Sequence, residues 1–197
     1  KLLGSQPGRH EAGRPSIGLV ADKRKRVMFA KRRNSVIKYG TRSPRGNYTA
    51  STQVTNTWFP PLPPGAPGAI FILDISGSMS SAYSPPAYTP TRWDVMVSNY
   101  ESFMKGFPTK KDFLLILFES VSHIMPAGKG PPPHMVKATA TEKDNAVNWL
   151  KTMKPTGLTY PLASFQTALL LKPKVIYFLC DGDFGSQEAA VMAAVQA

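Results

Sequence analysis

Reactive side chains are scarce in this sequence. Its single cysteine, Cys180, excludes a disulfide within the chain, which is typical of a reducing compartment but does not establish one. The three histidines, His10, His123 and His134, show no metal-ligand spacing, and no Cys-His-Asn arrangement is recognisable. Cys180 is therefore interpreted as a small buried side chain at a strand end, and the histidines as surface or loop residues.

Long apolar runs are also missing. No stretch approaches the roughly 18 to 20 consecutive apolar residues that a membrane helix needs, and the opening K-L-L-G is no signal peptide. The sequence thus predicts neither a membrane-spanning helix nor a targeting signal within the residues given. It also begins without methionine, so a preceding segment with an anchor stays open, and both the cell envelope and the cytoplasm remain candidate locations.

Acidic residues are almost absent from the first third. Residues 1–67 hold 13 of the 24 Lys and Arg residues but 2 of the 12 acids, so nearly all of the net charge of +12 lies there. We expect a basic, largely disordered arm over residues 1–58, because its first 50 residues lack sustained apolar periodicity. The Pro-rich residues 59–68 predict a stiff, extended linker. The remaining residues, 69–197, are long enough for one folded domain.

Apolar runs alternate with amphipathic segments from residue 69 onwards, which indicates an α/β domain with a mostly parallel sheet and helices on both faces. Strands are expected at residues 69–74, 113–118, 121–125 and 175–180, and a loop at residues 126–133. Helices are expected at residues 91–106 and 141–153, with Thr141 as N-cap of the second, and from Pro161 and Ser186 onwards.

The run A-I-F-I-L-D-I-S-G-S-M-S, residues 69–80, carries the most specific signal. A buried strand of this kind would place the oxygens of Asp74, Ser76 and Ser78 at its carboxyl end, where open α/β sheets bind ligands. Carboxylate and hydroxyl oxygens are hard ligands that suit Mg²⁺. Alone, such residues are also typical of an Asx or Ser turn.

This D-x-S-x-S run resembles the metal-ion-dependent adhesion site (MIDAS) of von Willebrand factor type A (VWA) domains of the prokaryotic type. Two later segments strengthen the resemblance: P-T-G-L-T, which ends at Thr159, and C-D-G-D, which contains Asp181. The resemblance implies a Rossmann-like VWA fold in which Ser76, Ser78 and Thr159 are direct metal ligands. It also implies that Asp74 and Asp181 act mostly through bound water.

The implied function is a divalent-metal-dependent interaction module. Mg²⁺, with Mn²⁺ or Ca²⁺ as substitutes, would keep an open position for an acidic residue of a partner protein, and no small-molecule substrate is expected. A metal-dependent hydrolase is the enzymatic alternative, since some phosphatases use a D-x-D motif at a strand end. Ser76 stands where that chemistry needs a second carboxylate, so the sequence favours a binding protein over an enzyme.

The chain departs from the family pattern in three respects. Leu158 stands where a second glycine is common and is expected to restrict the loop's approach to the metal. Cys180 replaces the usual threonine before Asp181. The family's last two strands and closing helix have no counterpart, so we expect a C-terminally truncated domain with an open sheet edge. Tyr83, Tyr88 and Tyr160 are candidates for the rim of the binding face.

The basic arm offers a further hypothesis. Lys23–Arg26 and Lys31–Arg33 would neutralise several phosphates, with Phe29 and Tyr39 available to stack on bases. Residues 1–50 are thus a candidate contact for nucleic acid or for an anionic membrane surface. A solvated tail is the alternative interpretation.

Overall fold

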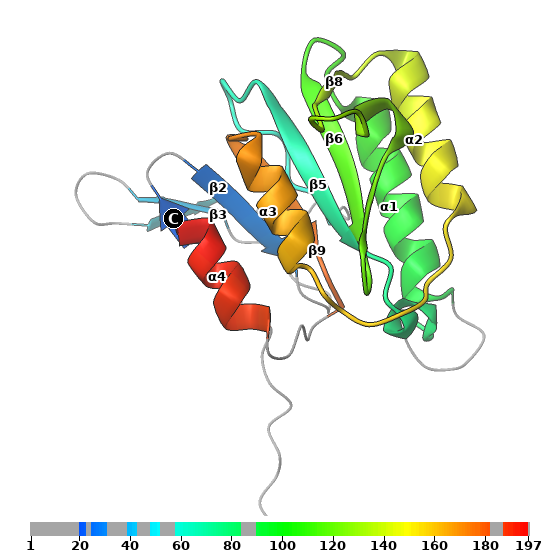
Figure 1. The fold of residues 1–197 in the computed structure, drawn as a ribbon. Coiled ribbons are helices and arrows are strands. Elements are labelled where there is room, and N and C mark those ends of the chain that lie inside the picture. Colours follow the sequence, from blue (N-terminus) through cyan, green and yellow to red (C-terminus); the bar gives the residue numbers. More distant parts are fainter. Residues whose placement is uncertain are drawn as a thin grey trace, which may run out of the picture.

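The computed structural model describes residues 20–22, 25–30, 39–42, 48–51, 58–83, 90–181 and 187–196 (Figure 1). The strands are β1 (Val20–Asp22), β2 (Lys25–Ala30), β3 (Tyr39–Arg42), β4 (Tyr48–Ser51), β5 (Gly68–Asp74), β6 (Asp112–Phe118), β7 (Ser122–Ile124), β8 (Val136–Lys137) and β9 (Val175–Leu179). The helices are α1 (Arg92–Gly106), α2 (Ala140–Thr152), α3 (Leu162–Leu170) and α4 (Glu188–Gln196), with 3₁₀ turns η1 (Gly77–Ser80) and η2 (Pro126–Gly128).

One mixed sheet forms the centre of the domain. Its strand order is β1-β2-β9-β5-β6-β7, and β8 pairs with β6 beside β7. The four central strands β2, β9, β5 and β6 are parallel, whereas β1, β7 and β8 pair antiparallel. Strands β3 and β4 form a separate antiparallel pair. The α/β fold class with a mostly parallel sheet is therefore confirmed.

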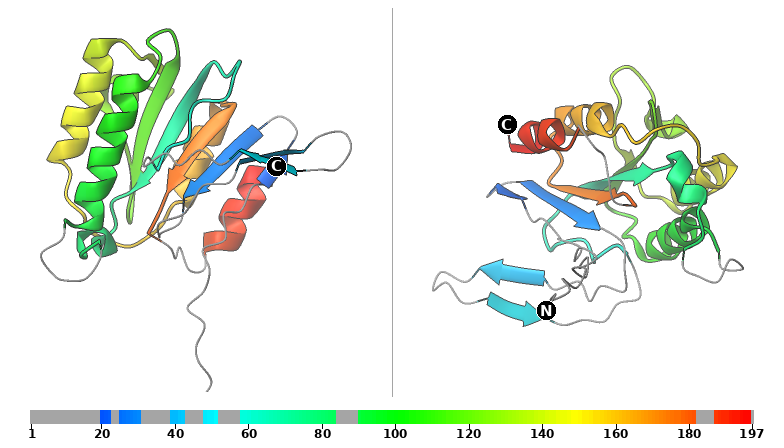
Figure 2. Two further views of the ribbon diagram at one scale, coloured as in Figure 1. Left: turned by 180° about the vertical axis from the view of Figure 1, so that it is seen from behind. Right: turned by 90° about the horizontal axis from the view of Figure 1, so that it is seen from below.

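Both faces of the sheet are buried, because successive side chains of a strand point to opposite faces. On one face Phe71 of β5 stacks on Tyr177 of β9 at a centroid distance of 5.0 Å, and Tyr100 of α1 packs on Phe71. On the other face Phe178 of β9 contacts Phe165 of α3 at 4.9 Å. Helix α2 lies beside α1 and α4 beside α3, so the sheet is covered on both sides (Figure 2).

The helices agree with the predicted segments, with differences at their ends. Thr91 caps α1 in a capping box with Asp94, in which each side chain accepts a hydrogen bond from the other residue's backbone N–H. The prediction that Thr141 caps the next helix is wrong: Thr139 accepts from the Glu142 N–H, so the N-cap lies two residues earlier and α2 begins at Ala140. Among the helices that the structure describes, none is long and apolar enough to cross a membrane. Ser186 lies outside the described residues.

The edge of β9 is paired, contrary to the expected open edge. Strand β2 runs parallel to β9 with Val27 opposite Ile176, and β1 continues the sheet beyond it. A short apolar run, V-M-F-A at residues 27–30, is enough for one strand of ordinary length. Because basic residues flank it on both sides, the composition of the segment predicts disorder and the strand is missed. Four strands thus lie within the arm for which disorder is expected, while the rest of residues 1–57 lies outside the described residues. The domain limits drawn from the sequence stay a prediction.

The Pro-rich segment packs on the domain and does not act only as a spacer. Phe59 is 1% exposed and meets Phe71 and Tyr177 edge-on, at centroid distances of 5.7 and 5.9 Å. The Tyr177 hydroxyl donates a hydrogen bond of 2.8 Å to the carbonyl oxygen of Pro60. Phe59 and Pro60 therefore cover part of the face of β9 beside α1, and the apolar core begins before the predicted domain limit.

We predict that Phe59→Ala lowers the free energy of unfolding by about 3 to 5 kcal/mol, the usual cost of removing a fully buried aromatic ring. Urea denaturation followed by circular dichroism measures this change. Leu170→Ala is the matched control, because Leu170 is 80% exposed and its loss should change stability by less than about 0.5 kcal/mol. A loss below about 1 kcal/mol for Phe59→Ala would show that the segment is only loosely attached.

Candidate metal centre

The D-x-S-x-S loop is a compact turn at the carboxyl end of β5. Asp74, the last residue of β5, is completely buried, and its Oδ1 accepts a 2.7 Å hydrogen bond from the Ser76 N–H. The Ser76 and Ser78 hydroxyl oxygens lie 3.0 Å apart, with Ser76 buried and Ser78 exposed. The structure therefore brings together the three residues that the motif predicts, with Ser78 at the open side.

Asp74 is an unusually costly residue for this position. Its Oδ2 is buried and accepts no hydrogen bond of normal geometry from the described residues. Burial raises the pKa of Asp74; hydrogen bonds from Ser76 and Cys180 oppose the rise, and the nearby charge of Asp181 adds to it. A carboxylate held here at neutral pH needs positive charge or water beside it.

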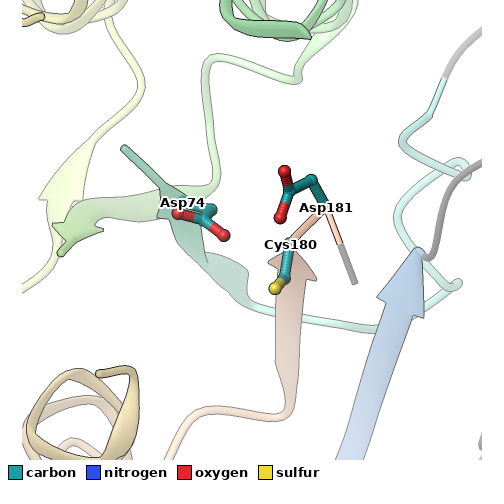
Figure 3. A group of neighbouring side chains, drawn as sticks. All are labelled: Asp74, Cys180 and Asp181. Atoms are coloured by element: carbon teal, nitrogen blue, oxygen red, sulfur yellow. The ribbon is translucent and has the colours of Figure 1, made fainter. Parts of the chain in front are cut away.

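The end of β9 supplies the second part of the site. Strand β9 pairs directly with β5, with Leu179 opposite Leu73, so the residues that follow both strands meet at one edge. The Asp74 and Asp181 carboxylates and the Cys180 thiol each place an atom within 4.8 Å of the others (Figure 3). The sequence predicted the pairing of Asp74 with Asp181 but not the inclusion of the thiol.

Arg92 is a site residue that the sequence analysis missed. Its guanidinium forms an ion pair with Asp181 Oδ2 and lies 3.3 Å from the Ser78 carbonyl oxygen, and both side chains of the pair are mostly buried. Arg92 is the first residue of α1, where the helix dipole disfavours a cation. That mismatch is the signal in the sequence that could have suggested an acidic partner.

The loop of Thr159 lies directly beside the D-x-S-x-S loop. The Gly77 N–H donates to the Gly157 carbonyl oxygen at 3.1 Å, and the Thr156 N–H donates to the Ile75 carbonyl oxygen at 2.8 Å. Thr159, two residues beyond Gly157, is half-buried. The structure thus places the predicted loop at the site, and metal contact by the Thr159 hydroxyl stays a prediction.

Glu119 supports this loop from the end of β6 and was also missed. Burial disfavours its carboxylate, but hydrogen bonds from Ser120 and the nearby His123 together lower its pKa. Its carbonyl oxygen accepts from the Tyr160 N–H at 3.0 Å. Its carboxylate occupies the space in which a side chain at Gly157 would lie.

The effect of Leu158 on the loop's approach to a metal stays a prediction, although the loop itself reaches the D-x-S-x-S loop. Leu158 is 57% exposed and points its bulk to solvent, while the neighbouring Gly157 makes the close approach. Among the predicted rim residues, Tyr160 is 42% exposed, whereas Tyr83 packs against Trp58 at a centroid distance of 5.8 Å. Tyr88 lies outside the described residues.

Comparison with solved structures identifies the architecture. No protein-family model matches the chain, and no curated protein does. A von Willebrand factor type A protein from Catenulispora acidiphila superposes with a TM-score of 0.52 at 16% identity, covering 76% of this chain and 32% of that one. The chain therefore has a VWA-like fold, and it spans about a third of the length of this similar protein.

Two other structures are similar at lower scores. An aerotolerance-related membrane protein from Bacteroides fragilis gives a TM-score of 0.47 at 15% identity, covering 66% of this chain and 62% of that one. The PilB minor pilin from Streptococcus sanguinis gives a TM-score of 0.44 at 13% identity, covering 60% of this chain and 30% of that one. The likeness to solved structures concerns the fold, so the chemistry of the site has to be argued from its own residues.

We predict that Gly157→Ala destabilises the protein by more than about 1 kcal/mol. Gly157 has φ +69°, and a Cβ there would overlap the Glu119 carboxylate and approach Ser120 Oγ to 2.6 Å. Thermal unfolding measures the loss. Gly106→Ala at the end of α1 is the control, because no atom lies within 4 Å of its added Cβ. Equal stability of both variants would contradict the described packing of the loop.

We predict that Asp74→Asn stabilises the metal-free protein at pH 7. The folded state keeps the Asp74 proton to a higher pH than the unfolded chain does, so stability falls as pH rises from 3.8 through the raised pKa. Asparagine keeps an oxygen for the Ser76 N–H and removes this loss, worth about 1.4 kcal/mol per unit of pKa. Urea denaturation in EDTA from pH 4 to 8 measures it. A variant less stable than the parent at pH 7 would contradict the argument.

Proposed function

We propose that this domain binds a divalent cation, Mg²⁺ in the first place, at the carboxyl edge of its sheet and uses it to hold an acidic residue of a partner protein. Ser76, Ser78 and Thr159 would supply hydroxyl oxygens, and Asp74 and Asp181 would act mostly through bound water. A bound cation of this kind offers an open coordination position to a carboxylate oxygen.

The buried Oδ2 of Asp74 carries the proposal. A buried carboxylate oxygen without a hydrogen bond costs free energy, and native proteins seldom keep one without a reason. In the described part of the chain, no hydrogen bond of normal geometry reaches this atom, the Cys180 thiol is only a weak donor to the carboxylate, and Asp181 brings a second negative charge close to it. A divalent cation with its water would satisfy the oxygen and neutralise the repulsion between the two acids.

The donor set suits a hard cation. Besides the two carboxylates, the turn brings the hydroxyls of Ser76 and Ser78 side by side at 3.0 Å, with Ser78 exposed so that the site opens outward. Such oxygens favour Mg²⁺, Mn²⁺ or Ca²⁺. The Cys180 thiol near Asp74 is a soft group that prefers other metals, and we assign it no ligand role.

Arg92 favours an acidic partner. The formal charges of Asp74, Asp181 and Arg92 sum to one negative charge, so a divalent cation would leave the site with one net positive charge. Neutral hydroxyl ligands do not reduce this charge. A site with a net positive charge and an exposed side attracts a carboxylate more strongly than a site neutralised by three acids would.

Binding is favoured over hydrolysis by the same contacts. Ser76 occupies the position of the second carboxylate that the D-x-D chemistry requires. The neighbouring acid, Asp181, forms an ion pair with Arg92 through its Oδ2 atom, so this oxygen is already occupied and is poorly placed to exchange protons with a substrate. The proposal is therefore a non-enzymatic interaction module.

The predictions on nucleic acid, membrane binding and location do not depend on the candidate metal centre. Binding of nucleic acid or of an anionic membrane by residues 1–50 stays a prediction, since most of these residues, and all side chains of β1 to β4, lie outside the described part of the chain. The location in the envelope or the cytoplasm likewise stays a prediction.

Calorimetry with Mg²⁺ and Mn²⁺ on the parent chain tests the metal site. We expect one site in the parent and a loss of affinity of more than about tenfold, or 1.4 kcal/mol, in Asp74→Ala and in Ser76→Ala. Asp144→Asn, which removes an exposed acid on α2, should bind like the parent. Absence of binding by the folded parent, or equal binding by all variants, would refute the metal site.

A second measurement tests the acidic partner. In saturating Mg²⁺, a short synthetic peptide with one central aspartate should bind, and its asparagine counterpart should not. Chelation of the metal with EDTA should abolish the binding. Binding that survives chelation, or that is equal for the two peptides, would show that the carboxylate does not complete the metal site.

A further inference from the structure

Exposed apolar side chains gather beside the candidate metal centre. Four large hydrophobic residues are exposed in the described part of the chain: Val121, Leu158, Tyr160 and Leu170. Three of them, Val121 at 55%, Leu158 at 57% and Tyr160 at 42%, belong to two loops that touch each other at the carboxyl edge of the sheet. We call these three residues the apolar rim. Single exposed apolar residues are ordinary on a protein surface, whereas a group at a binding edge indicates an interaction site.

Hydrogen bonds join the two loops that carry the apolar rim. The Leu158 N–H donates to Ser120 Oγ at 3.0 Å, which joins the Leu158 loop to the residue before Val121. The Tyr160 N–H donates to the Glu119 carbonyl oxygen at 3.0 Å, and the Glu119 N–H donates to the Val121 carbonyl oxygen at 3.0 Å. The two loops are thus tied together along their length.

The apolar rim also borders the metal-site loop. The residue before Leu158 is Gly157, whose carbonyl oxygen accepts from the N–H of Gly77, between Ser76 and Ser78. Consecutive Cα atoms are about 3.8 Å apart, so Leu158 lies within one residue of a direct contact with the D-x-S-x-S loop. A partner residue bound at the metal would therefore have its neighbours close to Leu158.

The apolar rim is held in place before any partner binds. Glu119 anchors the loop from below through the Ser120 N–H and lies 3.3 Å from the His123 Nε2 atom, and Gly157 leaves the space that this arrangement needs. A surface fixed in this way loses little conformational freedom on binding, so more of the contact energy appears as affinity.

We infer that the partner presents an acidic residue with a directly neighbouring large apolar residue, the acid for the metal and the apolar side chain for the apolar rim. This inference rests on the proposed metal-dependent function and narrows its partner. With a divalent cation bound, the site including Arg92 has a net positive charge, which favours a carboxylate of the partner. The adjoining apolar rim favours an apolar side chain next to that carboxylate. Neither feature alone would distinguish such a segment from any other acidic surface.

Two synthetic peptides of equal length test the inference, with a central aspartate flanked by leucines in one and by serines in the other. Their affinities for the parent chain are measured by NMR titration in saturating Mg²⁺. The leucine peptide should bind about tenfold more tightly, as expected when one apolar side chain is largely buried. Leu158→Ser should remove most of this advantage, and Tyr160→Ser part of it.

Leu170→Ser is the matched control. Leu170 is 80% exposed at the carboxyl end of α3, so its replacement should leave the preference for the leucine peptide unchanged. Because all of these side chains are exposed, the variants are expected to keep the fold, which their urea midpoints verify.

The outcomes separate the two proposals. Equal affinity for both peptides, or a preference that survives in Leu158→Ser, overturns the apolar rim while leaving metal-dependent binding of an acid intact. Failure of both peptides to bind the metal-loaded chain overturns the acidic partner and the apolar rim together. Sedimentation that shows a dimer of the parent and a monomer of Leu158→Ser would assign the surface to a second copy of this chain and also overturn the inference.

Discussion

The parallel pairing of β5 with β6 and β9 is the constraint on which the whole binding edge depends. Parallel neighbours end at the same side of a sheet, so residues at or just beyond the ends of these strands are brought together although they are far apart in the sequence: Asp74, Glu119 and Asp181. The buried aromatic layers on both faces hold the three strands in register. A shift of the strand register by one residue would turn the core side chains of the shifted strand to the other face and would separate the residues of the site.

The site places charge where a stable core would avoid it. Asp74 is buried among apolar strand ends, and its pKa is raised because burial disfavours the carboxylate. Arg92 balances the negative charge of Asp181 only, so among the described residues the charge of the Asp74 carboxylate has no positive partner at this edge. Functional sites are typically the places where such local costs persist, since removing them would also remove the affinity for a ligand.

The sequence predicted β5, β6, β9, α1 and the D-x-S-x-S turn because these depend on local patterns: unbroken apolar runs and a 3.6-residue period. It did not predict β2, whose place depends on pairing with a distant strand, nor the burial of Phe59 inside a Pro-rich segment. Arg92, Glu119 and the role of Gly157 arise from contacts between loops, which no local pattern encodes. The sequence placed Cys180 at the end of a strand, but it did not predict that the thiol lies beside Asp74.

The pairing of β2 with β9 joins nearly the first described strand of the chain to the last. During synthesis the β2 segment is made long before β9, and it lacks this partner until residues 175–179 have been made. Closing so large a loop is entropically costly, and contacts of this kind form late and slowly. The ribosome-bound chain therefore passes through a period in which the β2 backbone lacks this partner, a natural time for a chaperone to hold it.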